Sequence, residues 1–437
     1  MKRRGALVAL GGLVLMAILS TAGGWSSPLR AGTYQFLWSP ELWGYGGYQA
    51  LTGDVDGDGT DELVLQVMAG EYEGQEPAPA VITAVYRYDP RRALPTEVAR
   101  AEDVGSLVAV ADLDGNGSAE ILAREGWDGP LRAWRLDASG IIVPASPALM
   151  EAYEARGGFL PGESSSVVRS PQDLNGDGLL DRVSLSSTPD APTLLVETAA
   201  GKRVVPAAAL LGRASGQAAD MAEAVAGLAD LKVEAWPQAG MAWPVLVVGA
   251  RAEDGGVHLT AWVPEGDHYR LTWERSLPAG SGPYALPPSW ALLELTGDES
   301  PELVVGRGGV LEVLAWRDGA FHAVQRTPDN GGLGWAGLFA ADMDGDGRRE
   351  LVARHVSPNL YTHHLKIYAF RGDRLEGLAD LASIGSATGG QPVTWSWGKR
   401  EVLLLPRQFE QARPEALGLT DELGFTGKTC RSFRPGA

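Results

Sequence analysis

The chain has 437 residues, of which 45% are hydrophobic and 21% are charged, with 57 Gly and 28 Pro. This composition excludes a disordered chain, which needs low hydrophobicity, and a collagen, which needs glycine at every third residue; it favours short strands joined by many turns. The formal net charge of −18 repels phosphate, and no run of five Lys or Arg offsets it locally, so we expect no nucleic-acid partner.

Residues 1–22 have the order of a secretory signal peptide. The basic run at residues 2–4 precedes an uncharged stretch that ends near Ala22 in small residues suited to cleavage. An uncleaved membrane anchor is the alternative, because the stretch is at the lower edge of the length that spans a bilayer. Both interpretations predict a secreted or extracytoplasmic protein, which touches a membrane only if this N-terminal segment is retained.

One acidic pattern returns along the chain. It reads DVDGDGTDEL from Asp54 and returns from Asp112, Asp173 and Asp342, with Asp or Asn at positions 1, 3 and 5 and an acid at position 9. Glycine at positions 4 and 6 suits a tight loop that needs a positive φ. A decayed copy, ELTGDESPEL, begins at Glu294.

Each loop is flanked by short apolar runs, such as SLVAVA before the loop from Asp112 and LVLQV after the loop from Asp54. Runs of this kind around a glycine-bearing loop predict an antiparallel hairpin. A third strand recurs further on, and we interpret its large side chains as packing between neighbouring sheets rather than as ligand stacking. These side chains are Tyr86, Trp134, Leu195, Trp262, Trp316 and Tyr368.

The spacing of the loops predicts seven units. Their starts at 54, 112 and 173 are separated by 58 and 61 residues, and those at 294 and 342 by 48 residues. A degenerate unit fills the gap around Asp230, where GLADLKVEAWPQ leads to PVLVVGA, and a last unit without an acidic loop contains KREVLLL near Gly390. Units of this size with three or four strands are too large for a β-helix.

The fold that we predict is all-β, a seven-bladed β-propeller over residues 23–410, with a six- or eight-bladed propeller as the alternative. Radial packing of small sheets hides most strand edges, and the GTYQFLW segment from Gly32 is placed to supply the outer strand of the last blade. Residues 411–437 would form a C-terminal tail. A two-domain β-sandwich would not explain why the same loop recurs along the whole chain.

The acidic loops have the oxygen ligands of a calcium site. Three or four carboxylate or amide oxygens on a glycine-bent loop suit Ca²⁺ better than Zn²⁺, which prefers His and Cys. Position 7 would bind through its backbone carbonyl and the other positions through side chains. About four Ca²⁺ sites follow, with the predicted ligands Asp54, Asp56, Asp58, Thr60, Glu62, Asp112, Asp114, Asn116, Ser118, Glu120, Asp173, Asn175, Asp177, Leu179, Asp181, Asp342, Asp344, Asp346, Arg348 and Glu350.

Two other interpretations of the loops are an EF-hand and a turn that binds no metal. An EF-hand needs a bidentate Glu at position 12, which here is Leu65, Ala123, Ser184 or Ala353. Asp, Asn and Gly also make turns without metal, but a cation offsets the repulsion within four clusters of carboxylates. We expect the loop from Glu294 to be empty, since it lacks the first Asp and the second Gly. The Asp230 unit, with Lys232 at its third position, should bind no metal.

The loops and their flanking strands resemble the FG-GAP or VCBS repeats of integrin-α-like β-propellers, whose blades carry a Ca²⁺ loop of pattern D-x-D/N-x-D/N-G-x-x-D between their first two strands. The resemblance covers roughly residues 45–405 and implies a calcium-binding propeller, but it names no partner. Two features depart from the family pattern: position 9 is Glu in three loops, and the Phe-Gly and Gly-Ala-Pro signatures are not evident.

No local signature of catalysis occurs. G-x-S-x-G, H-E-x-x-H, Cys-x-x-Cys and phosphate-binding glycine loops are all missing. Strand alternation puts His363 and His364 on opposite faces, so we interpret them as ordinary strand residues. Cys430 is the single thiol, which excludes an intramolecular disulfide, and nothing near it in the sequence supplies a base.

The leading functional prediction is an exported, non-catalytic, monomeric propeller, stabilised by Ca²⁺, that binds a protein or glycan. A polysaccharide lyase or glycosidase built on a propeller is the alternative, since a fold alone does not exclude catalysis. A lectin is a third possibility, which exposed side chains at Trp43, Trp127 or Trp335 in clefts between blades would favour.

Overall fold

A computed structural model describes the fold of most of the chain. The described residues are 34–38, 48–69, 80–125, 129–161, 167–186, 193–206, 231–238, 241–252, 254–281, 285–298, 300–356, 362–372, 374–384, 393–407 and 413–419. The predicted signal or anchor at residues 1–22 lies outside them, as do Trp43, Trp127 and Cys430. No helix in the described part is long and apolar enough to cross a membrane.

The described strands form an all-β propeller, as predicted. Five sheets have four antiparallel strands each and a sixth has eight strands. The first two sheets consist of β2 (Tyr48–Gly53), β3 (Glu62–Ala69), β4 (Ala80–Asp89) and β5 (Leu94–Glu102), and of β6 (Ser106–Ala111), β7 (Glu120–Arg124), β8 (Leu131–Leu136) and β9 (Ile142–Pro144). Helix α2 (Pro147–Ala155) follows β9 and was not predicted from the sequence.

The eight-stranded sheet has two antiparallel halves. The halves are β10 (Val167–Gln172), β11 (Asp181–Ser186), β12 (Thr193–Thr198) and β13 (Gly201–Pro206), and β14 (Leu231–Trp236), β15 (Val245–Arg251), β16 (Val257–Glu265) and β17 (His268–Leu277). One parallel pair, Val204 with His268, joins β13 to β17. Within each half, consecutive strands pair as they do in the four-stranded sheets.

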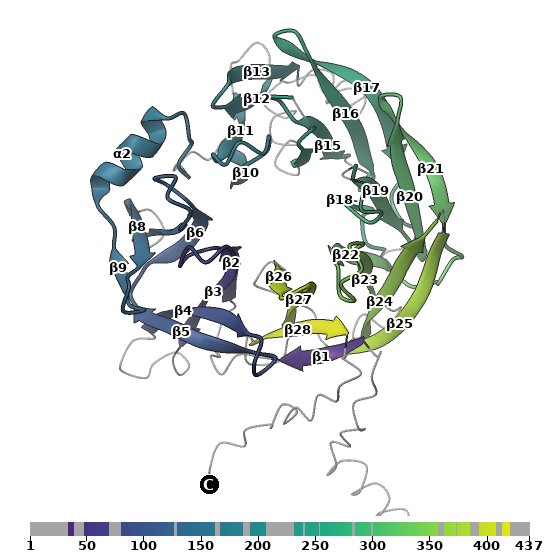
Figure 1. Cartoon of the computed structure of the whole chain (residues 1–437). Helices are drawn as coiled ribbons and strands as arrows, with labels where there is room; N and C mark the ends of the chain where they lie inside the picture. Colours follow the sequence, from purple (N-terminus) through teal and green to yellow (C-terminus); the bar gives the residue numbers. More distant parts are fainter. Residues whose placement is uncertain are drawn as a thin grey trace, which may run out of the picture.

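The remaining sheets complete the ring. They consist of β18 (Ser289–Leu293), β19 (Glu302–Arg307), β20 (Val310–Arg317) and β21 (Ala320–Arg326); of β22 (Gly334–Ala341), β23 (Glu350–Val356), β24 (Thr362–Arg371) and β25 (Arg374–Ile384); and of β26 (Val393–Trp397), β27 (Arg400–Arg407), β28 (Arg413–Leu419) and β1 (Tyr34–Trp38). Figure 1 shows the sheets around a central opening, with β2, β6 and β22 facing it and β5, β9 and β25 on the outside.

The last sheet is closed by the two ends of the described chain. β1 pairs antiparallel with β28, from Tyr34 opposite Leu419 onward, as predicted for the segment from Gly32. β28 begins at Arg413, beyond the predicted propeller boundary at residue 410, so the predicted tail contains a strand. This pairing satisfies the outer edge of β28 that would otherwise be exposed.

The hydrophobic core lies between successive sheets. Leu63 and Leu65 of β3 pack with Trp395 and Leu404 of the last sheet, and each of the four is at most 1% exposed. The third-strand aromatics Tyr86, Trp262 and Tyr368 are buried at 4%, 2% and 8% exposure, which confirms their predicted packing role. Each sheet therefore buries side chains against its neighbours, as ring closure requires.

Two sequence interpretations need correction. Lys232 lies inside β14, before the hairpin connection, and not at the third position of a loop. Because this unit has no acidic motif, no residue marks where its loop begins. Trp335 is 1% exposed and packs against His355 with ring centroids 4.9 Å apart, so it is a core side chain and lines no lectin cleft.

Candidate metal centres

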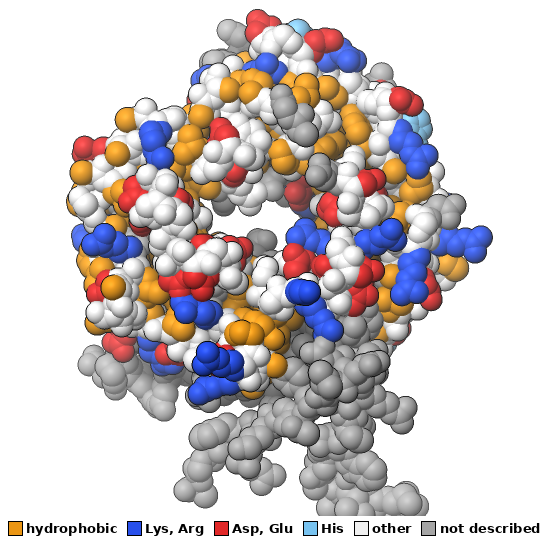
Figure 2. Space-filling view, in the orientation of Figure 1, with side chains coloured by type: hydrophobic (Ala, Val, Ile, Leu, Met, Phe, Trp, Pro, Cys, Tyr) orange, Lys and Arg blue, Asp and Glu red, His pale blue; other side chains and the backbone are white. Residues whose placement is uncertain are grey.

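All four acidic loops occupy the same place in their sheets. The loop from Asp54 joins β2 to β3, and the loops from Asp112, Asp173 and Asp342 join the first and second strands of their own sheets. The first strands face the central opening (Figure 1), and Figure 2 shows carboxylate side chains gathered beside that opening. The fold therefore presents equivalent loops around one opening.

The carboxylate at position 1 organises each loop. Asp54 accepts hydrogen bonds from the backbone N–H groups of Gly57 (2.7 Å), Asp58 (3.0 Å) and Gly59 (2.8 Å). Asp112, Asp173 and Asp342 accept the same three bonds at 2.7–3.2 Å. A ring of N–H donors holds the carboxylate in place and stabilises its negative charge.

The two glycines allow this wrapping. Gly57 has φ +77° and Gly59 has φ +84°, and the glycines of the other three loops have the same left-handed conformation. A side chain with a Cβ is strained at these angles, so the predicted need for glycine is confirmed.

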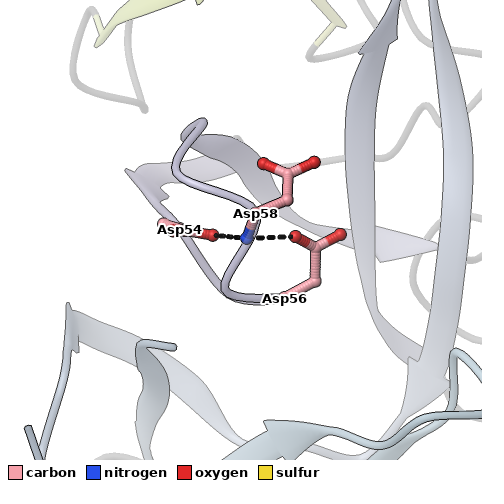
Figure 3. A group of neighbouring side chains, drawn as sticks. All are labelled: Asp54, Asp56 and Asp58. Atoms are coloured by element: carbon pink, nitrogen blue, oxygen red, sulfur yellow. Dashed lines mark hydrogen bonds between the residues drawn. The ribbon is translucent and has the colours of Figure 1, made fainter. Parts of the chain in front are cut away.

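Positions 3 and 5 continue the turn with side-chain oxygens. The N–H of Asp58 donates to Asp56 at 3.2 Å, and the N–H of Thr60 donates to Asp58 at 2.9 Å. Figure 3 shows the carboxylates of Asp56 and Asp58 on the same side of the loop, with Asp54 beside them. One oxygen from each of the three lies within 4.8 Å of the others, a separation that one cation can span.

The acid at position 9 starts the second strand and is buried. Glu62, Glu120, Asp181 and Glu350 are at most 4% exposed, and each accepts a hydrogen bond from the N–H at position 2, at 2.8–3.1 Å. The pKa of each of these carboxyls is raised to about 7, mainly by burial and also by the neighbouring carboxylates of the loop, whereas that hydrogen bond lowers it.

One buried oxygen in the loop from Asp173 has no partner. Oδ2 of Asp181 accepts from Leu174, but Oδ1 has no hydrogen-bond partner among the described residues, and the side chain is 1% exposed. A buried oxygen without a partner is costly, and a cation would satisfy it. The donor set of Asp, Asn and backbone oxygens fits Ca²⁺.

The loop from Asp342 also brings three of its acids together. Oxygens of Asp342, Asp344 and Glu350 lie within 4.8 Å of one another, so positions 1, 3 and 9 converge here. A cavity of ≈ 180 Å³ lies beside them, lined in part by Ala369 and Arg371 of β24. The loops from Asp112 and Asp173 each have an asparagine among the predicted ligands, Asn116 and Asn175.

The loop from Glu294 keeps the shape but changes the chemistry. Glu294 accepts from the N–H of Gly297 at 2.6 Å, and Glu302 accepts from Leu295 at 3.0 Å. The hydroxyl of Thr296 donates to Glu302 at 3.3 Å, so protein groups satisfy both oxygens of this buried acid. That the loop holds no metal stays a prediction.

The sequence analysis did not identify the positively charged residue on β4 that contacts the first loop. Arg87 of β4 forms ion pairs with Asp56, Asp58 and Glu62. The strand register could have identified Arg87: Leu63 pairs with Tyr86, and this pairing places Arg87 across from Glu62. The sequence alone does not show the pairing of β3 with β4, and so it does not show which residue of β4 faces the loop.

The loops also join neighbouring sheets. The N–H of Ala119 donates to the carbonyl of Asp54 at 2.6 Å, and Trp395 Nε1 donates to the carbonyl of Asp61 at 2.9 Å. The N–H of Glu401 donates to the carbonyl of Asp342 at 2.7 Å, and its carboxylate accepts two bonds from Arg349 at 2.6 and 2.9 Å. Anything that orders a loop therefore acts on the contact between two sheets.

Two histidines, His355 and His364, lie close together away from the acidic loops. His364 Nδ1 lies 2.8 Å from Asp380 Oδ1, and the rings of His355 and His364 are 6.5 Å apart. His355 is 5% exposed and its Nε2 lies 2.7 Å from the carbonyl of Gly331. His363 pairs with Val356 in the strand, and its side chain lies outside the described part.

Comparisons with known proteins bear on the repeat. No curated protein sequence matches the chain. One solved structure that matches is titled "Crystal structure of BBS1N in complex with ARL6DN, soaked with lead"; it has 11% identity and a TM-score of 0.42 over 90% of this chain and 100% of that chain, a likeness from which we draw no conclusion. Residues 295–353 match the FG-GAP-like repeat, a span that begins in the loop from Glu294 and contains the whole loop from Asp342. The chain therefore contains an FG-GAP-like repeat at these residues.

Proposed function

We propose that the chain is an exported, non-catalytic propeller of seven blades that binds Ca²⁺ at its acidic loops and uses the ring to bind a protein or glycan. The observation that carries the proposal is the repetition of one loop geometry in four sheets: an N–H-wrapped Asp at position 1 and a buried acid at position 9. Four such concentrations of negative charge favour a bound cation.

The two halves of the eight-stranded sheet support the proposed count of seven blades. Each half has four antiparallel strands in sequence order, and a single pair of residues joins them. Counting the halves as two blades gives seven with the five four-stranded sheets.

Calcium would act as a structural clip. The side chains at positions 1, 3, 5 and 9 would hold it, and its charge would offset the repulsion among them. Because the loops from Asp54 and Asp342 contact neighbouring sheets, an ion in either loop would stabilise both the hairpin and the ring. A ligand that binds only the folded state raises stability by mass action, even where millimolar Ca²⁺ is needed to fill the site.

The calcium part is tested by metal analysis and thermal unfolding of the purified chain. We expect about four Ca²⁺ per chain after dialysis against Ca²⁺, and a thermal midpoint that falls in EGTA and recovers with Ca²⁺ but not with equal Mg²⁺. A chain that holds no metal and has the same midpoint with and without EGTA contradicts the proposal.

The binding part is tested on immobilised polysaccharides and glycoproteins. Binding that EGTA abolishes, without release of unsaturated or reducing sugar ends, supports a non-catalytic module. Release of such products by the chain contradicts it and favours a lyase or glycosidase instead.

A further inference from the structure

The loop from Asp54 has a guanidinium group among its predicted metal ligands. Arg87 forms ion pairs with Asp56, with Asp58 (Nε to Oδ2 3.9 Å) and with Glu62 (Nε to Oε1 3.2 Å). These acids hold positions 3, 5 and 9, the oxygens that a cation would need. A guanidinium group and a metal ion exclude each other here, because both are positive and both require the same lone pairs.

Strand register gives each loop one facing residue. Arg87 stands across from Glu62 because the neighbouring pair is Leu63 with Tyr86. The same register position holds Arg135 on β8, Thr198 on β12 and Ala369 on β24. Two loops thus face arginine and two face a small neutral side chain.

The structure separates the two arginines. Arg135 is exposed and, in the described part of the chain, forms no ion pair with the loop from Asp112, although its charge lowers the pKa of Glu120 against the larger effect of burial. Arg87 instead reaches Glu62, whose side chain is fully buried. An ion pair with a buried acid is worth more than one on the surface, where water screens the charges.

The loop from Asp342 is the opposite case. Ala369 leaves room for the cavity of ≈ 180 Å³ beside Asp344 and Glu350. Three arginines, Arg348, Arg349 and Arg371, also line that cavity. Arg371 Nη1 forms an ion pair with Glu376 at 3.3 Å, and Arg349 Nη2 forms one with Glu401 at 2.6 Å. No guanidinium among the described residues bridges the acids at positions 3, 5 and 9 of this loop.

We propose that Arg87 is an internal counter-cation of the loop from Asp54, which competes with the metal ion and makes this loop the weakest of the four Ca²⁺ sites. The ranking of sites rests on the proposed calcium function, whereas the counter-cation role rests on the ion pairs alone. The loop contains five carboxylates, including Asp61, so Arg87 offsets part of their repulsion when Ca²⁺ is scarce. The hydrogen bond from Trp395 to the carbonyl of Asp61, which connects the last and first sheets, is then retained without metal.

The test is a calcium titration of the metal-stripped full chain, comparing wild type, Arg87→Met and Arg91→Met. Methionine keeps the unbranched apolar part of the side chain and removes the charge; Arg91 is exposed in the turn after β4 and serves as the matched control. We expect Arg87→Met to tighten one site by about tenfold, because removing a unit charge beside a divalent ion changes the interaction by at least that factor. Arg91→Met should bind as wild type does.

Thermal unfolding in EGTA tests the counter-cation role without any metal. Arg87→Met should unfold about 2–4 °C below Arg91→Met, since Glu62 loses its positive partner. Equal midpoints overturn the inference whether or not calcium binds. A lower midpoint together with no calcium binding to any variant supports the counter-cation role and overturns the proposed calcium function.

A reciprocal variant checks the competition at a second loop. Ala369→Arg places a guanidinium in the cavity beside Glu350 and should weaken one calcium site by about tenfold. If calcium binds the wild type but Arg87→Met and Ala369→Arg leave every affinity unchanged, arginine does not compete with the ion and the inference is wrong.

Discussion

At the scale of single residues, the acid at position 9 is the most demanding part of each loop. It is placed by the strand that it begins, and burial rather than hydrogen bonding determines its pKa of about 7. The sequence motif predicts a carboxylate ligand at this position. It does not predict the burial, because burial depends on the neighbouring sheet.

Asp181 is the position where metal loss is easiest to measure. Asp181→Asn keeps the size of the side chain and the acceptor for Leu174 but removes the charge. We expect the variant to bind one Ca²⁺ fewer and to unfold about 2–4 °C below wild type in Ca²⁺, with a smaller difference in EGTA. Metal analysis and calorimetry measure both effects.

Asp267→Asn is the matched control, since Asp267 is fully exposed at the tip of the turn before β17. It should bind the wild-type number of ions. An unchanged metal content in Asp181→Asn would remove that loop from the set of calcium sites.

His355 makes a separate prediction about pH. Burial lowers its pKa below the ordinary value of 6.5, with the charges of Lys366 and His364 acting in the same direction and Gly331 and Asp380 opposing them. The unfolded chain therefore binds a proton first, so the contribution to stability is present above pH 6.5 and is lost as the pH falls from 6.5 through the folded-state pKa.

The thermal midpoint of the wild type should accordingly fall more between pH 7 and pH 5 than that of His355→Gln, by about 1 °C for each kcal/mol in a chain of this length. His322→Gln, at an exposed position on β21, should keep the wild-type pH profile. Parallel profiles for wild type and His355→Gln would show that His355 does not titrate differently in the two states.

At the scale of elements, α2 connects two acidic loops. Pro147 occupies the first turn, where its missing N–H costs nothing, and the helix packs Tyr153 into the interior at 0% exposure. The hydroxyl of Tyr153 accepts from the N–H of Leu180 at 2.6 Å, and Arg156 donates to the carbonyl of Leu113. One helix thus contacts the loops of the second and third sheets.

Tyr153→Phe should leave the N–H of Leu180 buried without a partner. The expected loss is about 1–3 kcal/mol in the free energy of unfolding, measured by urea titration. Glu151→Ala, on the exposed side of the same helix, should change it by no more than about 0.5 kcal/mol. Equal losses in both variants would show that the contact with the loop contributes nothing.

The hairpins were predictable from the sequence and α2 was not. A loop with fixed glycines between apolar runs specifies a turn locally, and β2 with β3 forms around the loop from Asp54 as predicted. α2 has nine residues and follows no repeat, so its position depends on the loops that it contacts. The unit containing Lys232 was misaligned for the same reason, since it lacks the acidic motif.

At the scale of the whole molecule, the ring is held by the pairing of β1 with β28. Removing residues 1–38 should expose the edge of β28, lower the thermal midpoint by about 5 °C or more and promote association between chains. Calorimetry and size-exclusion chromatography measure the two effects. A chain that begins at residue 33 retains β1 and should match the full chain; equal behaviour of both truncations would show that β1 does not close the ring.

The pairing of β1 with β28 also orders events in time. Tyr34 is synthesised early and its partner Leu419 nearly last. β1 therefore remains unpaired while the sheets between the two strands form. A chain that passes through a membrane from its N-terminus would have to deliver its final strand before the ring can close. Closure of the ring would then occur only after the entire chain has crossed the membrane.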